Sequence, residues 1–173
     1  DVTQEEQVDR LVDSAVAELG RLDIAVSNAA SPGKDLYLWE QTLENWNQTL
    51  ATNLTAQFLV ARAALRHLMP QRSGVIILFS STAAYEAFPR KSHYSASKFA
   101  ALALTRTLAK EAGAHGIRAN CVAPGPVRTK LAMAVHSQEI IDAYHDAIPL
   151  NRYGSEDEIA SVIVFLCSDK ASY

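Results

Sequence analysis

Three residues of types that serve in acid–base chemistry stand at a fixed spacing in one short stretch of the chain. Ser81 ends an apolar run, Tyr94 follows thirteen residues later at the start of a helical pattern, and Lys98 comes four residues after Tyr94. Residues four apart lie on one face of a helix. We therefore expect the phenol and the ammonium to point the same way, with the strand-end hydroxyl available to join them.

Such a trio can exchange a proton with a carbonyl or an alcohol. A free tyrosine has a pKa of about 10, and a nearby cation favours the phenolate and lowers that pKa. Tyr94 could then donate a proton to a developing alkoxide or accept one from an alcohol, while Ser81 hydrogen-bonds the same oxygen. The plain alternative is a packed tyrosine beside a solvated lysine, because Tyr-x-x-x-Lys alone arises easily by chance.

The stretch STAAYEAFPRKSHYSASK resembles the catalytic region of the classical short-chain dehydrogenase/reductase family, close to its 3-oxoacyl-carrier-protein reductase branch. The resemblance runs along the whole chain. It implies an NAD(P)-dependent enzyme, with NAD or NADP as cofactor, that interconverts a carbonyl and a secondary alcohol by hydride transfer. It also implies that Tyr94 is the acid/base, that Lys98 lowers its pKa and holds the nicotinamide ribose, and that Ser81 orients the carbonyl.

A fourth catalytic residue follows from the same resemblance. Asn53 lies 28 residues before Ser81, where the family has an asparagine that kinks a helix and whose backbone holds a water linked to the lysine. The alternative is an ordinary asparagine at a helix boundary.

The resemblance further assigns cofactor contacts besides Tyr94 and Lys98. At the N-terminal side, Asp1 matches an aspartate that contacts adenine, and Asn28 and Ala29 match residues that support the sheet and meet the adenosine side. Ala30 stands where the family's N-N-A-G motif has glycine, so it lacks glycine's freedom at positive φ. A helix-leading acid and a strand-end turn are the plain alternatives.

A second group of contacts comes from the turn after the third predicted strand. A proline–glycine turn lets backbone groups approach a ligand. The resemblance implies that Val127 and Thr129 contact the nicotinamide amide and a cofactor phosphate, next to Pro124 and Gly125. A turn without a ligand is the alternative.

Composition and charge narrow the class of protein. The 173 residues are 49% hydrophobic and 20% charged with a net charge of -3, which suits one soluble globular domain and disfavours nucleic acid or an anionic membrane as partner. With no signal peptide, we expect a cytoplasmic location and two buried free thiols, Cys121 and Cys167. His136 and His145 are nine residues apart, which is no metal-ligand spacing, so we expect solvent-facing histidines and no metal.

Periodicity and end signals predict the elements. Apolar runs over 22–27, 75–79 and 117–123 predict strands, and helical patterns cover 54–69 (ended by Pro70), 92–114, 130–148 and 156–166. The family resemblance implies that 130–148 forms a lid over the substrate. We expect helix caps at Thr3 (a capping box with Glu6), Gly20, Thr42 and Ser155.

Alternating strands and helices predict an α/β fold, a Rossmann-like doubly wound parallel sheet with helices on both faces. The family fold has more strands than these three and a Gly-rich phosphate loop, and no G-x-x-x-G-x-G occurs here. We therefore expect residues 1–173 to be a partial NAD(P)-binding domain that carries the catalytic half. The N-terminal strands and the last strand would be missing, and the biological chain would be longer at both ends.

Two other functions stay open at this point. One is a non-catalytic binding or regulatory member of the same fold. The other is a sugar-nucleotide epimerase or dehydratase of the related extended group, which would need a larger C-terminal region. The expected partners are a small-molecule carbonyl or alcohol substrate and further copies of the chain, as a dimer or homotetramer. The resemblance implies that such a homo-oligomer pairs the helices at 54–69 and 92–114.

Overall fold

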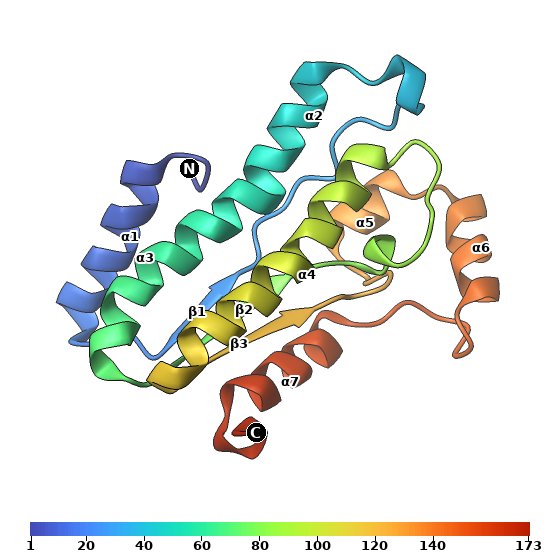
Figure 1. Cartoon of the computed structure of the whole chain (residues 1–173). Coiled ribbons are helices and arrows are strands. Elements are labelled where there is room, and N and C mark those ends of the chain that lie inside the picture. Colours follow the sequence, from blue (N-terminus) through green and yellow to red (C-terminus); the bar gives the residue numbers. More distant parts are fainter. The chain divides into compact units, whose positions relative to one another are not determined.

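A computed structural model describes residues 1–173, apart from the side chain of Leu131. The chain forms two compact units, residues 1–123 and residues 124–173. Figure 1 shows the whole chain, coloured along the sequence. Among the described residues, every helix is too short or too polar to span a lipid bilayer.

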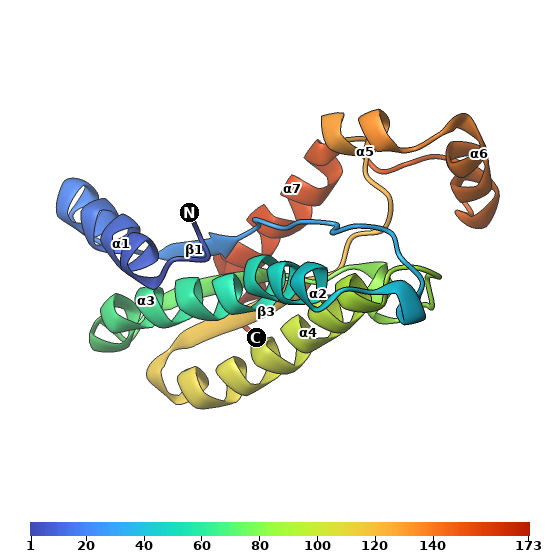
Figure 2. The same ribbon diagram turned by 90° about the horizontal axis from the view of Figure 1, so that it is seen from above.

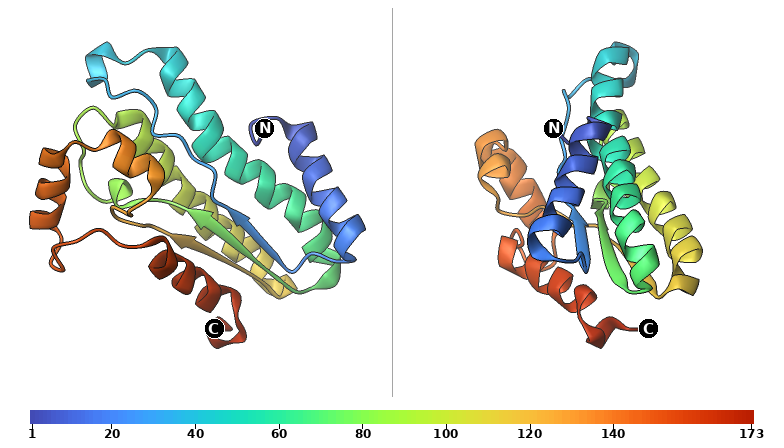
Figure 3. Two further views of the ribbon diagram at one scale, coloured as in Figure 1. Left: turned by 180° about the vertical axis from the view of Figure 1, so that it is seen from behind. Right: turned by 90° about the vertical axis from the view of Figure 1, so that its left-hand side faces the viewer.

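The first unit is built on a three-stranded parallel sheet in the order β1-β2-β3. Its strands are β1 (Ile24–Ser27), β2 (Gly74–Phe79) and β3 (Ile117–Val122). The register pairs Ser27 with Leu78 and Phe79 with Val122, so β1 ends one residue before β2 does. All three arrows point the same way (Figure 3). The three predicted strands are thereby confirmed.

Helices α3 and α4 run side by side over this sheet (Figure 2), and α1 packs beside α3. Helix α3 lies against β1 and β2, and α4 lies against β2 and β3. The helical elements of the unit are α1 (Glu5–Leu19), the 3₁₀ turn η1 (Leu38–Glu40), α2 (Leu43–Leu50), the π turn η2 (Ala51–Thr55), α3 (Ala56–Gln71), the 3₁₀ turn η3 (Thr82–Ala84), α4 (Ser92–Ala112) and the 3₁₀ turn η4 (Gly113–His115).

The main core lies between the sheet and the two long helices. Alternate sheet residues such as Ile76 and Leu78 face α3 and α4, as expected for a strand whose successive side chains point to opposite faces. Leu68 of α3 and Leu108 of α4 fill the space above them, and Leu68 is fully buried. A smaller cluster, which joins α1 to α3, contains Val8, Val12, Leu59 and Ala63.

The predicted helix ends of the first unit are partly confirmed. Gly20 ends α1 at φ +86° with its N–H bonded to the Val16 carbonyl, and the Thr42 hydroxyl accepts the Asn45 N–H at the start of α2. The capping box at Thr3 is wrong. Helix α1 begins after Gln4, because the Thr3 N–H and hydroxyl both donate to the Asp1 carboxylate.

The end of α3 also differs from the prediction. Helix α3 runs through Pro70 to Gln71, and Arg72 ends it in a left-handed conformation. Proline has a helical φ and removes only one N–H donor, so the last turn can accommodate it. The Gln71 amide then donates to the Leu22 carbonyl at 2.6 Å, which ties this end of the helix to the chain before β1.

The second unit contains α5 (Lys130–Val135), α6 (Gln138–Ala147), α7 (Glu156–Cys167) and the 3₁₀ turn η5 (Asp169–Ala171). The single predicted helix over 130–148 is wrong, because Ser137 caps a new helix through the Ile140 N–H. The capping box of Ser155 and Glu158 is confirmed.

Two further expectations about side chains need correction. His136 and His145 are half-buried rather than solvent-facing. Both rings pack edge-on against Tyr153, whose hydroxyl lies 2.9 Å from Nδ1 of His136. Cys121 and Cys167 are half-buried, not fully buried, and no disulfide joins them in the described chain.

We predict that Leu68→Ala destabilises the fold far more than the same change at an exposed leucine. Removing this fully buried side chain leaves a cavity and should cost about 2–5 kcal/mol of the free energy of unfolding. Leu43→Ala is the matched control, because Leu43 is 74% exposed and should cost less than about 0.5 kcal/mol. Urea denaturation measures both values, and equal losses would contradict this core.

Candidate active site

Helix α4 carries the phenol and the ammonium on one face, as their spacing predicts. Tyr94 lies in the first turn of α4 and Lys98 in the next turn, and the Lys98 Nζ stands 5.7 Å from the centre of the Tyr94 ring. The Lys98 side chain is buried, with 2% of the residue exposed, and its Nζ donates to the Phe79 carbonyl at 3.2 Å. A buried cation thus lies at the end of β2, next to the tyrosine.

Burial changes the proton affinity of this lysine. Desolvation lowers the pKa of Lys98 to about 8, and the charge interaction with Cys121 acts in the opposite direction. An ammonium has three N–H donors. In the described part of the chain only the Phe79 carbonyl accepts one of them, so two donors remain for a ligand.

The π turn η2 holds Asn53 fully buried at the junction of α2 and α3. Its side-chain amide accepts the Ser31 N–H at 2.7 Å and donates to the Ser31 carbonyl at 2.9 Å and to the Ser97 hydroxyl at 3.1 Å. Ser97 in turn donates to the Tyr94 carbonyl at 2.7 Å. Asn53 therefore joins the loop after β1 to the helix turn that carries the tyrosine. The break expected at Asn53 is a π turn, which keeps the helix continuous.

The two serines that follow β2 have different surroundings. The Ser80 hydroxyl is buried and donates to the Lys98 carbonyl at 2.7 Å, which fixes the strand end to α4. Ser81 is half-buried and accepts the Ala83 N–H at 3.2 Å at the start of η3, which packs on α4. The Ser81 hydroxyl hydrogen has no acceptor among the described residues, so Ser81 is the serine that can donate to a substrate.

The predicted cofactor contacts of the first unit lie in two places. Asn28, Ala29 and Ala30 form an exposed segment directly after β1. In parallel α/β sheets, ligands bind at the carboxyl ends of the strands, which is where this segment, Ser81 and Lys98 lie. Asp1 lies at the start of α1, where its carboxylate binds the Thr3 N–H.

The other four predicted cofactor contacts belong to the second unit. Val127 pairs with Gly154 in an isolated bridge, and the Thr129 hydroxyl accepts the Ala132 N–H as the cap of α5. Pro124 and Gly125 precede them in the connecting turn. The geometry of the first unit does not include these residues, so their cofactor contacts stay predictions.

Sequence reasoning missed a buried histidine beside the tyrosine. His93 is fully buried, with Gln41 Nε2 at 2.8 Å from its Nδ1 and the Pro32 carbonyl at 3.1 Å from its Nε2. An amide nitrogen can only donate and a carbonyl can only accept, so the ring is the neutral tautomer with the proton on Nε2. Burial lowers the pKa of His93, consistent with that neutral form.

This histidine fixes the loop between β1 and α2 beside the site. A Cβ at Gly33 would lie 2.3 Å from the His93 Nε2, and Gly33 has a φ of +65°, so the loop needs glycine there. A polar residue next to Tyr94 in a helix-forming segment was the only sequence signal, and it does not reveal burial.

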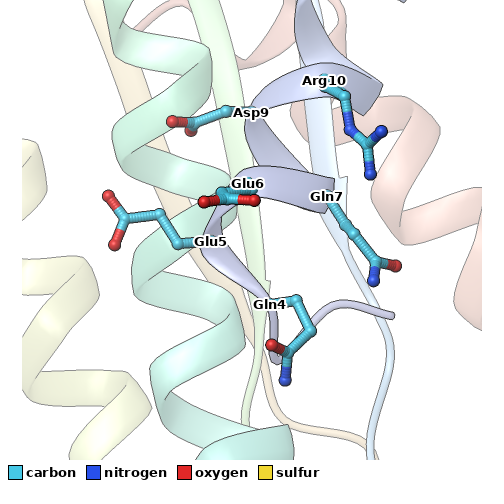
Figure 4. A pocket seen from close by; sticks show the side chains of 6 residues that line it. All are labelled: Gln4, Glu5, Glu6, Gln7, Asp9 and Arg10. Atoms are coloured by element: carbon cyan, nitrogen blue, oxygen red, sulfur yellow. The ribbon is translucent and has the colours of Figure 1, made fainter.

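A surface hollow elsewhere does not coincide with these residues. It lies at the first turns of α1 (Figure 4) and is lined by Gln4, Glu5, Glu6, Gln7, Asp9 and Arg10. Glu5 and Asp9 already pair with Arg62 and Arg66 of α3 at 2.5 and 2.8 Å. These acids therefore join two helices, and among the described residues no group of His, Cys, Asp or Glu could hold a metal ion.

Comparisons with known proteins identify the family. A sequence model of the family described as enoyl-(acyl carrier protein) reductase matches residues 1–173. The 3-oxoacyl-[acyl-carrier-protein] reductase FabG of Aquifex aeolicus is 37% identical over 98% of this chain. The match spans 67% of that relative, so the chain covers about two thirds of its length.

Solved structures agree in fold and in cofactor class. The NAD+-bound xylitol dehydrogenase superposes with a TM-score of 0.91 at 30% identity, over 99% of this chain and 72% of that one. ElxO with NADP bound superposes with a TM-score of 0.93 at 30% identity, over 100% and 71%. The Rossmann-like α/β prediction is thereby confirmed, and the chain belongs to the short-chain dehydrogenase/reductase family of NAD(P)-dependent oxidoreductases.

Proposed function

We propose that this protein interconverts a carbonyl and a secondary alcohol by hydride transfer with NAD or NADP, and that Tyr94 is the acid/base. The observation that carries the proposal is the buried Lys98 ammonium, 5.7 Å from the Tyr94 ring and with two N–H donors unused by the described chain. A cation at this distance stabilises the phenolate and lowers the energy of proton transfer.

The roles of the side chains follow from their contacts. In the reducing direction the Tyr94 hydroxyl gives its proton to the developing alkoxide, and in the oxidising direction the phenolate takes the proton of the alcohol. Ser81 donates its hydroxyl hydrogen to the same substrate oxygen, because its lone pair already accepts the Ala83 N–H. Asn53 acts indirectly: its side-chain amide fixes the Ser31 loop and binds Ser97, which in turn donates to the Tyr94 carbonyl.

The residues present suit a nicotinamide cofactor. The spare donors of Lys98 match the hydroxyls of a ribose, and the small exposed residues Ala29 and Ala30 permit close approach to the backbone after β1. Asp1, Asn28, Pro124, Gly125, Val127 and Thr129 are further proposed contacts. When bound, the cofactor supplies or accepts the hydride.

The cost of burying Lys98 favours catalysis over a non-catalytic role of the same fold. An ammonium removed from water without a carboxylate partner destabilises the folded chain. A protein that only binds would gain nothing from this cost, whereas an acid/base pair requires the cation. We also propose a cytoplasmic location, which the half-buried thiols of Cys121 and Cys167 support, because thiols persist in a reducing compartment.

We further propose that the protein is a homo-oligomer that pairs through α3 and α4. The exposed aromatic residues Phe58 of α3 and Phe99 of α4 support this proposal, with 43% and 57% exposure. Large exposed apolar side chains on adjacent helices are typical of surfaces that contact another chain.

Tyr94→Phe should abolish most of the turnover while the fold is kept. The change removes only the hydroxyl that exchanges the proton, and general acid–base catalysis contributes about 10²–10⁴-fold. Cofactor oxidation with a panel of ketones measures the rate, and circular dichroism checks the fold. Tyr37→Phe removes a hydroxyl from an exposed tyrosine stacked on Trp39 and should leave the rate unchanged. Full activity of the Tyr94 variant would refute the assignment.

Lys98→Met should remove activity but stabilise the protein at neutral pH. The pKa of Lys98 is about 8 in the folded chain against an ordinary lysine value of 10.5, so between these values the unfolded chain binds a proton that the folded chain lacks. The free energy of unfolding therefore rises with pH across that window, by about 3 kcal/mol, and Lys98→Met loses the rise.

Denaturation curves between pH 7 and 11 test this prediction. Lys110→Met is the matched control, because Lys110 is exposed on the same helix and should preserve both the activity and the rise. A Lys98→Met protein that is less stable than the wild type at pH 7 would contradict the prediction.

Phe99→Glu should reduce the mass of the oligomer in light scattering after size-exclusion chromatography. A carboxylate placed in an apolar contact must be desolvated without a partner. Leu11→Glu is the control, because Leu11 is 62% exposed on α1. A wild-type monomer, or an unchanged mass of the Phe99 variant, would overturn the proposed pairing.

A further inference from the structure

Gln57 is a fully buried glutamine in the first turn of α3. Its Nε2 donates to the Asn53 carbonyl at 2.6 Å and to the Phe79 carbonyl at 3.0 Å, and its Oε1 accepts the Phe79 N–H at 2.9 Å. Three of its four hydrogen-bonding positions are therefore used. All three partners are backbone groups, one of Asn53 and two of Phe79.

The Phe79 peptide needs these bonds because its neighbouring strand has ended. The Ser80 N–H bonds to the Val122 carbonyl of β3, so the Phe79 groups point to the opposite side of β2, toward β1. Strand β1 ends at Ser27, which is paired with Leu78. The Gln57 amide thus takes the place of a strand at Phe79, and it satisfies two buried backbone groups that would otherwise be costly.

The same Phe79 carbonyl accepts the hydrogen bond of Lys98. Gln57 and the Lys98 ammonium therefore share one oxygen, at 3.0 and 3.2 Å. A carbonyl oxygen has two lone pairs, and these two donors use both. The position of the ammonium then depends on how the Phe79 peptide is held, and Gln57 holds it on the side away from β3.

We propose that Gln57 is a positioning residue for the acid/base pair: its amide joins the Asn53 carbonyl to the Phe79 peptide and thereby fixes the acceptor that holds the Lys98 ammonium beside Tyr94. Gln57 touches neither the phenol nor the substrate side of Ser81 in the described contacts. This role rests on the proposed function of Tyr94 and Lys98.

Only an amide of this length can make all three bonds. Methionine has nearly the same shape but neither donates nor accepts here, and asparagine is one methylene too short to reach both Asn53 and Phe79. A glutamate carboxylate would accept from the Phe79 N–H but could not donate to either carbonyl.

The chain offers a matched control on the same helix. Gln71 lies at the other end of α3 and donates to one backbone carbonyl, that of Leu22, at 2.6 Å. Gln71→Met therefore removes the same type of side chain and a comparable hydrogen bond far from Lys98. Comparison of Gln57→Met with Gln71→Met separates a positioning role from a general loss of stability.

The first readout is the titration of Lys98, which is monitored by NMR of the protein labelled with 13C at lysine Cε. The Lys98 signal is assigned by its absence from the spectrum of Lys98→Met. The titratable groups that face this ammonium are Tyr94 on its own helix and Cys121 on β3. In Gln57→Met the ammonium loses its fixed acceptor, so the pKa of Lys98 should fall by about half a unit below its wild-type value. Gln71→Met should leave the pKa of Lys98 unchanged.

The second readout is the pH dependence of turnover. In Gln57→Met, kcat should fall about tenfold with little change in KM for the carbonyl substrate, because the ammonium is displaced and substrate contacts are kept. The pH at which kcat changes should shift by the same amount as the pKa of Lys98. Gln71→Met should keep the wild-type kcat and profile even if its melting temperature falls.

An unchanged Lys98 titration in folded Gln57→Met protein would overturn the proposal, as would an equal effect of Gln71→Met. If Gln57→Met does not fold, Gln57→Asn replaces it, with the same expected direction and the same refuting result. The NMR titration needs no turnover. An inactive wild-type protein would therefore refute the proposed function without affecting the test of Gln57.

Discussion

The burial of one ammonium group at the end of β2 governs the arrangement of the first unit. Lys98 has no carboxylate partner in the described chain; its ammonium donates to a backbone carbonyl, lies near an aromatic ring and interacts electrostatically with Cys121. A cation in such surroundings is costly, and its lowered pKa is the measure of that cost. The remaining polar side chains nearby are arranged so that the cation stays beside Tyr94.

These side chains form a frame of buried hydrogen bonds around α4. Asn53 fixes the loop after β1 and reaches Ser97, Ser80 bonds the backbone of Lys98, and Gln57 holds the Phe79 peptide. The bond between Asn53 and Ser97 joins η2 to α4, and the other bonds join a helical element to a strand end or a loop, so the frame helps to fix the position of α4 relative to the sheet. Buried hydrogen-bond networks rigidify the groups that they join, and rigidity is what an acid/base pair needs in order to meet a substrate at fixed geometry.

Sequence reasoning succeeded where the signal is local. The apolar runs predicted all three strands, and Gly20, Thr42 and Ser155 end or begin helices as expected. The cap at Thr3 was predicted wrongly, because the Thr3 hydroxyl donates to the Asp1 carboxylate. The single helix over 130–148 was predicted wrongly, because Ser137 caps a second helix. His136 was placed in solvent because its contact with Tyr153 joins positions seventeen residues apart.

The residues of the candidate active site also differ in whether a local signal predicts them. The spacing of Tyr94 and Lys98 is a property of one helix and was therefore predictable, whereas the burial of Lys98 depends on how that helix packs on the sheet. Gln57 and His93 are polar residues in helical segments, and only the folded chain shows that both are fully buried. Tertiary packing, which no sequence window contains, makes them part of the site.

The most direct test of the central claim is transfer of deuterium from nicotinamide-deuterated NADH or NADPH to a ketone. Mass spectrometry of the alcohol product detects the transferred deuterium. The account predicts deuterium on the carbinol carbon with the wild-type protein, and loss of most of that product with Tyr94→Phe. Absence of transfer from either cofactor over a broad panel of ketones, or transfer that is undiminished in Tyr94→Phe, would contradict it.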